Sequence, residues 1–137
     1  MRKALIAPLM LAAALTGCPG TLEDPERFAG QFGTCPDIPT LFTGTCATAS
    51  CHTADNPAGS LDLASPDIVG RLSGKAAAGG SGKLIDTGAP DQSVLYTKLS
   101  APPPFGARMP LTGTPLDDTE VACVLTWIED STKGGSP

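Results

Sequence analysis

Two cysteines and a histidine stand close together in the middle of this 137-residue chain. Cys46 and Cys51 are separated by four small residues, and His52 follows the second cysteine directly. Cysteine sulfurs form disulfides or bonds to carbon, and a neutral imidazole ligates metals through its unprotonated nitrogen. The run therefore offers either a short disulfide loop or one wall of a cofactor site.

The order of these residues matches the cysteine–histidine end of the attachment motif for c-type haem. In that motif two sulfurs add across the haem vinyl groups as thioethers, and the adjacent histidine ligates the iron. The usual motif has two residues between the cysteines, whereas this chain has four, and the longer gap predicts a bulge. Short cysteine pairs in exported proteins are also commonly disulfides, so both interpretations stay open at this point.

Met109 is the second candidate ligand. Once residues 1–17 are removed as a leader, His52 is the one histidine and Met109 the one methionine of the remaining chain. Histidine and methionine are the axial pair of cytochromes c. Met109 lies in a loop framed by prolines, which would present its thioether to the open face of a haem ring. The alternative is an exposed methionine without a function.

Short helices and loops are expected to position these residues. One helix is predicted over 39–46, and a second, short helix is predicted to begin after a cap at Ser65, with Pro66 in its first turn. Two more helices are predicted, over 93–99 and from Asp117 to the glycines at 134–135. Asp117 and Glu120 have the spacing of a capping box. Residues 75–83 are predicted to form a surface loop too featureless to pack, and strands are expected to be short at most.

The composition predicts one small domain with a thin core. Hydrophobic residues make up 41% of the chain, aromatic residues only 4%, and there are 16 glycines and 14 prolines. A flat apolar cofactor would add to such a core. The formal net charge of −5 argues against nucleic acid as a partner, because nucleic-acid binding rests on clustered Lys and Arg.

Residues 1–17 have the pattern of an export leader, with two basic residues and an apolar stretch too short to span a bilayer. The ending at residues 15–18 resembles the lipobox of bacterial lipoproteins, which implies that Cys18 is acylated and anchors the chain to a membrane. Ordinary secretion with Cys18 as a thiol is the alternative. Residues 18–34 are interpreted as a flexible tether, and the location as the cell envelope, periplasmic or outer surface.

Over residues 36–131 the chain resembles the class I cytochrome c domain. The motifs that carry the resemblance follow one another in the family's order, at residues 46–52, 59–63, 91–99, 108–110 and 124–128. The resemblance implies an all-α, loop-rich domain over 35–131, with three to five short helices around one haem c. The tail at 132–137 is expected to be disordered, because glycines end the last helix and chain ends fray. It assigns thioether bonds to Cys46 and Cys51, and axial iron ligation to His52 and Met109.

With both axial positions filled, this assignment implies an electron carrier with no catalytic residue. The expected partners are redox proteins of the envelope that meet the acidic chain through positive patches, at rates that fall as salt rises.

The resemblance also implies a disulfide between Cys35 and Cys123, because the first and last helices pack together in that fold. The bridge would close a loop of about 89 residues and contribute on the order of 4.6 kcal/mol in the chain-entropy model. A Cys46–Cys51 bridge would contribute only about 2.2 kcal/mol.

Two other function classes remain. One is a haem-free lipoprotein with two disulfides, acting as a surface or interaction module. The other is a haem enzyme or gas sensor in which Met109 does not hold the sixth position. Zinc is disfavoured, because one histidine and four cysteines at these spacings form no paired-ligand pattern.

Overall fold

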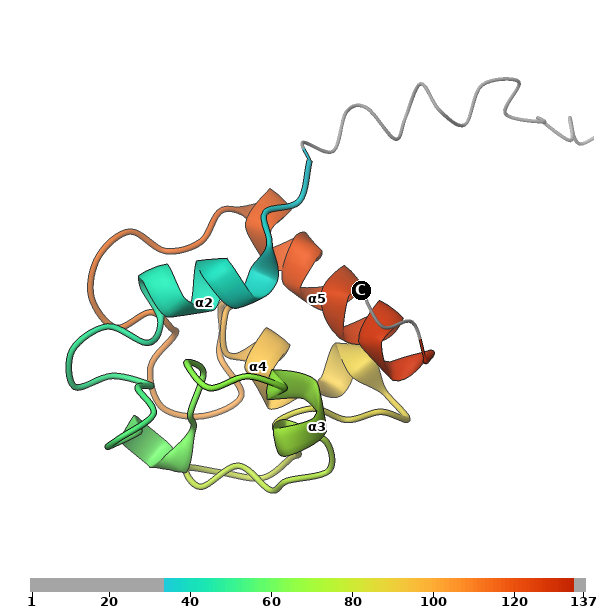
Figure 1. The fold of residues 1–137 in the computed structure, drawn as a ribbon, viewed down its shortest axis with the longest axis horizontal. Helices are drawn as coiled ribbons and strands as arrows, with labels where there is room; N and C mark the ends of the chain where they lie inside the picture. Colours follow the sequence, from blue (N-terminus) through green and yellow to red (C-terminus); the bar gives the residue numbers. More distant parts are fainter. Residues whose placement is uncertain (1–33, 135–137) are drawn as a thin grey trace, which may run out of the picture.

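Four α-helices and two short 3₁₀ helices form the part of the chain that the computed structural model describes, residues 34–134 (Figure 1). The expected leader, Cys18 and the expected tether up to residue 33 lie outside the described residues, as do residues 135–137 of the expected tail. The elements are α2 (Ile38–Thr45), η1 (Ala58–Ser60), α3 (Ile68–Leu72), η2 (Pro90–Gln92), α4 (Val94–Thr97) and α5 (Asp118–Thr132). Between residues 34 and 134 the β-structure consists of two isolated bridges. The expected all-α, loop-rich class is therefore confirmed.

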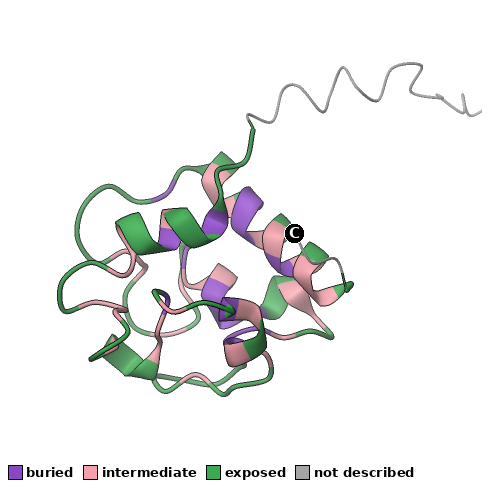
Figure 2. Cartoon of the chain, viewed as in Figure 1, coloured by how far each residue is buried: buried purple, intermediate pink, exposed green. Residues whose placement is uncertain are grey.

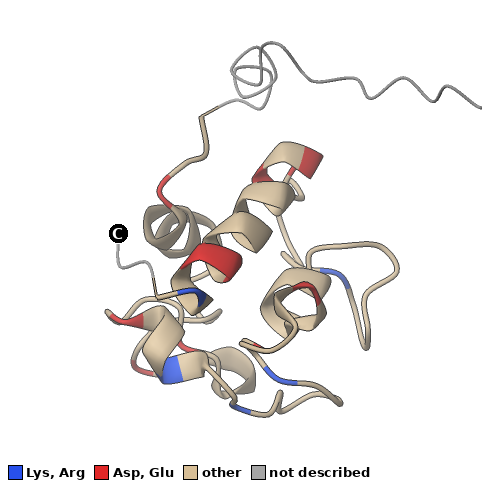
Figure 3. Ribbon diagram, turned by 90° about the vertical axis from the view of Figure 1, so that its right-hand side faces the viewer, with Lys and Arg blue, Asp and Glu red and all other residues tan. Residues whose placement is uncertain are grey.

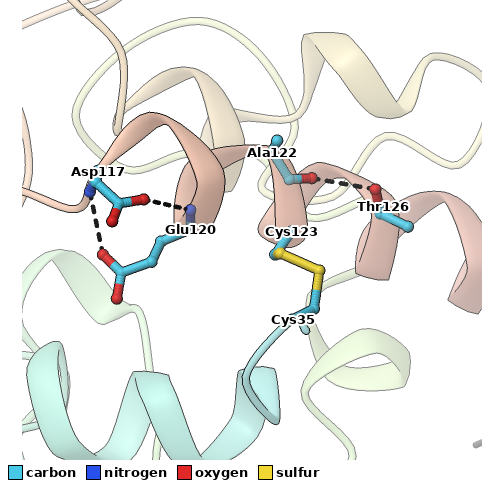
Figure 4. The surroundings of a disulfide bond; sticks show 6 residues. All are labelled: Cys35, Asp117, Glu120, Ala122, Cys123 and Thr126. Carbon is cyan, nitrogen blue, oxygen red and sulfur yellow. Dashed lines mark hydrogen bonds between the residues drawn. A yellow bond between two sulfur atoms is a disulfide. The ribbon is translucent and has the colours of Figure 1, made fainter. Parts of the chain in front are cut away.

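The two longest helices begin where side-chain caps are available. The Asp37 carboxylate accepts a hydrogen bond from the Thr40 amide at 3.0 Å and starts α2. At α5, the Asp117 carboxylate accepts from the Glu120 amide at 2.8 Å, and the Glu120 carboxylate accepts from the Asp117 amide at 3.0 Å (Figure 4). The predicted capping box is thus confirmed. These bonds satisfy amides that have no partner inside the helix.

Helices α2 and α5 pack against each other and are joined by a disulfide (Figures 1 and 4). Cys35, just before α2, is bonded to Cys123 of α5, with a Cα–Cα distance of 5.5 Å. Next to it, the rings of Phe42 and Trp127 meet edge to face, with centroids 5.7 Å apart. The expected bridge between the first and last helices is confirmed.

The core lies between α2, α4 and α5, whose buried positions turn toward the middle of the molecule (Figure 2). Its least exposed members come from α2, α3, α5 and the loop before η2: Phe42, Leu72, Ile85, Val124 and Ile128. Ser93 is also fully buried, and its hydroxyl accepts a hydrogen bond from the Asp86 amide at 2.9 Å. Among residues 34–134, no helix is long and apolar enough to cross a membrane.

The structure corrects three local predictions. The cap of α3 is Asp67 instead of Ser65, and its carboxylate accepts from the Gly70 amide at 3.0 Å. Residues 75–83 do pack, because Gly79 and Gly80 have no Cβ and let the Phe105 ring lie against their backbone. Thr132, the first residue assigned to the tail, is still part of α5.

Candidate cofactor-binding site

A cavity of about 420 Å³ opens between α2, α4 and the loops around them. Its size is within the range of small-molecule and cofactor sites. Its walls come from the end of α2, the segment from Cys46 to Leu63, the loop at 77–84, α4, and the loop at 105–112. Most of the lining is apolar. Of the four charged residue types Lys, Arg, Asp and Glu, the lining contains only Lys98.

All four residues predicted to bind a cofactor line this cavity: Cys46, Cys51, His52 and Met109. They come from two segments that are far apart in the sequence. Cys46 and Cys51 are free thiols in the structure and are not bonded to each other. The two other cysteines of the described range are those of the disulfide, and Cys18 lies outside that range.

The ring of His52 is held by two backbone carbonyls. Its Nδ1 atom lies 3.1 Å from the carbonyl oxygen of Ala58 and 3.1 Å from that of Leu61. Because carbonyl oxygens only accept, Nδ1 carries the proton and donates it, so that the lone pair of the neutral ring is on Nε2. Metal-ligating histidines are oriented in this way by an outer hydrogen bond. His52 is therefore prepared to ligate through Nε2.

The four residues between the cysteines form the expected bulge. Ser50 has a left-handed backbone conformation, with φ of 66°, and the Cys51 amide donates to the Thr48 carbonyl at 2.9 Å. The His52 amide donates to the Cys46 carbonyl at 3.1 Å, which ties the two ends of the bulge together. Thr48, Ala49 and Ser50 are exposed, so the extra length projects outward.

The Cys46 thiol is in a less polar environment than an ordinary cysteine. Burial, together with the neighbouring Cys51, raises the pKa of Cys46 to about 11. Cys46 is therefore a neutral thiol at neutral pH. The Cys51 thiol has only long contacts, 3.8 Å from the Thr48 hydroxyl and 3.7 Å from the Ala49 carbonyl oxygen.

Two basic side chains hold the segment that carries Met109, here called the methionine loop (residues 100–116). The Lys98 ammonium donates to the Phe105 carbonyl at 2.6 Å and to the Ala107 carbonyl at 2.5 Å. The Arg108 guanidinium donates to the Leu99 carbonyl at 2.6 Å and to the Leu116 carbonyl at 3.3 Å. The Met109 amide itself donates to the Lys98 carbonyl at 2.9 Å.

A second arginine fixes the backbone on the histidine side. The Arg71 guanidinium donates to the carbonyls of Ser65 at 2.7 Å, Pro66 at 2.8 Å and Asp62 at 3.2 Å. It also forms an ion pair with the Asp62 carboxylate at 3.2 Å. Asp62 directly follows Leu61, whose carbonyl contacts His52, so this network fixes the chain beside His52.

Asp62 is expected to stabilise the fold in a pH-dependent way. Hydrogen bonds from Ser65 and Ala64 and the charge of Arg71 lower its pKa from 3.8 to about 2. Because the pKa is lower in the folded state, the stabilisation is complete above about pH 4 and is lost as the pH falls toward 2. Asp62→Asn is therefore expected to lower the free energy of unfolding by about 1 kcal/mol at pH 7, after screening by solvent.

Denaturant unfolding of Asp62→Asn and of the natural protein at pH 7 and below pH 3 measures this difference. Asp55→Asn, at an exposed aspartate in the turn after His52, is the matched control and is expected to have little effect. A difference that stays constant over this pH range would contradict the assigned role of Asp62.

Several residues of the site have no distinctive signal in the sequence. Ala58 and Leu61 contribute backbone carbonyls, and Lys98 is an ordinary polar position in a helical pattern. In the sequence, the motif at residues 59–63 is the one candidate feature close to the carbonyls of Ala58 and Leu61. Between residues 34 and 134, no group of three or more His, Cys, Asp or Glu side chains is placed to hold a metal ion by itself.

The cavity thus presents an imidazole nitrogen, a thioether and two thiols around an apolar space. These groups suit a flat apolar cofactor with a metal at its centre, which needs protein ligands only above and below its plane.

Comparison with known proteins yields no match: no family model fits the sequence, and neither curated proteins nor solved structures are significantly similar to it.

Proposed function

We propose that the chain is a monohaem c-type cytochrome that carries single electrons in the cell envelope, anchored there by lipid on Cys18. The observation that carries the proposal is that Cys46, Cys51, His52 and Met109 line one apolar cavity. The proposal includes a fold like that of class I cytochromes c for residues 35–131. The proposal rests on these four side chains and on the apolar cavity that they line, because the comparisons with known proteins found no relative.

The two thiols are the proposed attachment points. In thioether formation the sulfur bonds to one carbon of a haem vinyl group and the thiol hydrogen goes to the neighbouring carbon, so the addition needs no oxidant. This reaction requires reduced cysteines, and Cys46 and Cys51 are both free in the structure. Their position on the cavity wall and the exposed bulge between them are compatible with bonds to two points on one ring.

His52 and Met109 are the proposed axial ligands. Bound haem supplies an iron centre that gains and loses one electron. The carbonyls of Ala58 and Leu61 keep the His52 lone pair on Nε2, and the hydrogen bond from the Met109 amide to Lys98 fixes the backbone that carries the thioether. Two protein ligands leave no coordination position for a substrate. The proposed activity is therefore electron transfer and not catalysis.

The proposed partners are redox proteins of the envelope. Acidic residues of α5 lie in its first turn and near its end, as the red segments of its ribbon in Figure 3 show, while the cavity wall has no acidic residue. Positive patches on a partner would be attracted to the acidic surface, and the rate of electron exchange is then expected to fall as salt rises. Rates that are independent of salt would contradict this part of the proposal.

Mass spectrometry of the denatured protein tests the attachment. The full chain is produced in a host with haem-attachment machinery, and the expected result is an added mass of one haem. Cys46→Ala and Cys51→Ala alone report which sulfur forms a bond, and the double variant is expected to lose all added mass. Ser50→Ala, which changes the bulge but neither thiol, is the matched control and is expected to keep it.

The opposite result would favour the haem-free module. In that case the natural protein has no added mass, and its mass is lower than that of the reduced chain by four hydrogens, because Cys46 and Cys51 form a second disulfide. A haem enzyme or gas sensor would instead have the added mass and an open axial position, which binding of carbon monoxide detects.

A further inference from the structure

We propose that Lys98 is the positioning residue for Met109: its side chain and its backbone together hold the methionine loop so that the thioether faces the cavity. The inference deepens the proposed function, and it rests on that function only for the claim that Met109 ligates iron. The contacts of Lys98 can be tested whether or not haem is bound.

Lys98 contacts the methionine loop at three points. Its ammonium donates to the carbonyls of Phe105 and Ala107, at 2.6 and 2.5 Å, and its own carbonyl accepts from the Met109 amide at 2.9 Å. The side chain thus holds the segment before Met109, and the backbone holds Met109 itself. Hydrogen bonds from a charged donor are stronger than those between neutral groups, by roughly a factor of two.

Phe105 adds a third kind of contact. The Lys98 ammonium lies 4.6 Å from the centre of the Phe105 ring, in the geometry of a cation–π interaction. Gly79 and Gly80 also lie against this ring: a Cβ added to Gly79 would lie 3.0 Å from the ring, and one added to Gly80 would overlap with it. Phe105 therefore links Lys98 to the loop at 75–83, and this ring also lines the cavity.

The methionine loop has few other bonds to hold it. Between residues 101 and 116, the Met109 amide is the one backbone amide that donates to another backbone group. Five of these residues are prolines, at 102–104, 110 and 115, which have no amide hydrogen to donate. Arg108 contributes two bonds from the side chain, to Leu99 and Leu116. Loss of the Lys98 ammonium would thus free the part of the loop that precedes Met109.

Lys98→Met tests the proposal, because methionine keeps the length of the side chain and removes the ammonium. The first readout is hydrogen exchange of the Met109 amide in the full-length protein, which is expected to become faster by about tenfold or more. The Val124 amide in α5 serves as the internal reference and is expected to change much less. Lys83→Met, at an exposed lysine paired with Asp86, is the matched control and is expected to leave Met109 exchange unchanged.

The second readout uses the haem-loaded protein and carbon monoxide as the probe. Lys98→Met is expected to bind carbon monoxide at concentrations at which the natural protein and Lys83→Met bind little, and to have a lower reduction potential, because the methionine ligand is displaced more easily. Lys98→Arg keeps the positive charge and the hydrogen-bond donors. Its carbon monoxide binding and reduction potential are therefore expected to be closer to those of the natural protein than the values of Lys98→Met are.

Unchanged Met109 exchange in Lys98→Met would overturn the inference, and so would an equal acceleration at Met109 and Val124, which indicates general destabilisation. Faster exchange at Met109 alone, with carbon monoxide binding unchanged in a loaded protein, would overturn the claim that Lys98 positions a ligand. If the natural protein binds no haem, the proposed function fails, while selective acceleration at Met109 would still establish the contact of Lys98 with the loop.

Discussion

His52→Ala is expected to decrease the yield of haem-loaded protein by more than about tenfold and to abolish six-coordinate iron in what remains. Even loss of an outer partner of a ligating histidine costs about 10- to 100-fold in metal affinity, and this change removes the ligand itself. The chain has no second histidine that could replace it. Absorption spectroscopy and haem staining of denatured protein measure both effects.

Met109→Ala is the matched variant, because it removes the other proposed ligand and leaves His52 and both thiols in place. It is expected to keep covalent haem, to bind carbon monoxide, and to have a lower reduction potential than the natural protein. If His52→Ala has the spectrum of the natural protein, or if Met109→Ala binds no more carbon monoxide than the natural protein does, the assignment of the two ligands is wrong.

Removal of the disulfide is expected to lower the free energy of unfolding by about 4 to 5 kcal/mol. Cys35 and Cys123 are 88 residues apart in sequence, so the bond restricts nearly the whole described chain in the unfolded state. The change is made as Cys35→Ala with Cys123→Ala, because Cys123 is only 4% exposed and a polar replacement would add a desolvation cost. Denaturant unfolding of both proteins measures the difference.

Each single variant is the control for the double variant. Cys35→Ala and Cys123→Ala each remove the whole bond, so the two single losses and the double loss are expected to be similar. A loss below about 1 kcal/mol in the double variant would show that the bond contributes little to stability. Losses that add up would indicate that each side chain contributes through packing instead.

Local sequence signals predicted the helices well, because their caps depend on neighbouring residues. Asp117 and Glu120 carry the capping box of α5 in their types and spacing. The sequence pattern predicts Ser65 as the cap of α3, whereas the cap is Asp67. The helix begins later because the Arg71 side chain binds the carbonyls of Ser65 and Pro66 and holds them outside it. No local pattern contains that contact.

The candidate ligands were predicted from residue type and spacing, because the chain has one histidine, directly after Cys51, and one methionine beyond the expected leader. The groups that orient them could not be predicted in the same way. Ala58 and Leu61 hold His52 through backbone carbonyls, which every residue has. The role of Lys98 depends on where the methionine loop folds back over α4, and that is a property of the tertiary structure.

The absorption spectrum of the full-length protein, produced with haem-attachment machinery, tests the central claim most directly. The account predicts a Soret band, a sharp α band on reduction, the weak long-wavelength band of methionine-ligated iron on oxidation, and haem stain that remains after denaturation. A colourless protein, with Cys46 and Cys51 joined in a disulfide, would contradict the proposed cytochrome and leave a lipid-anchored binding module.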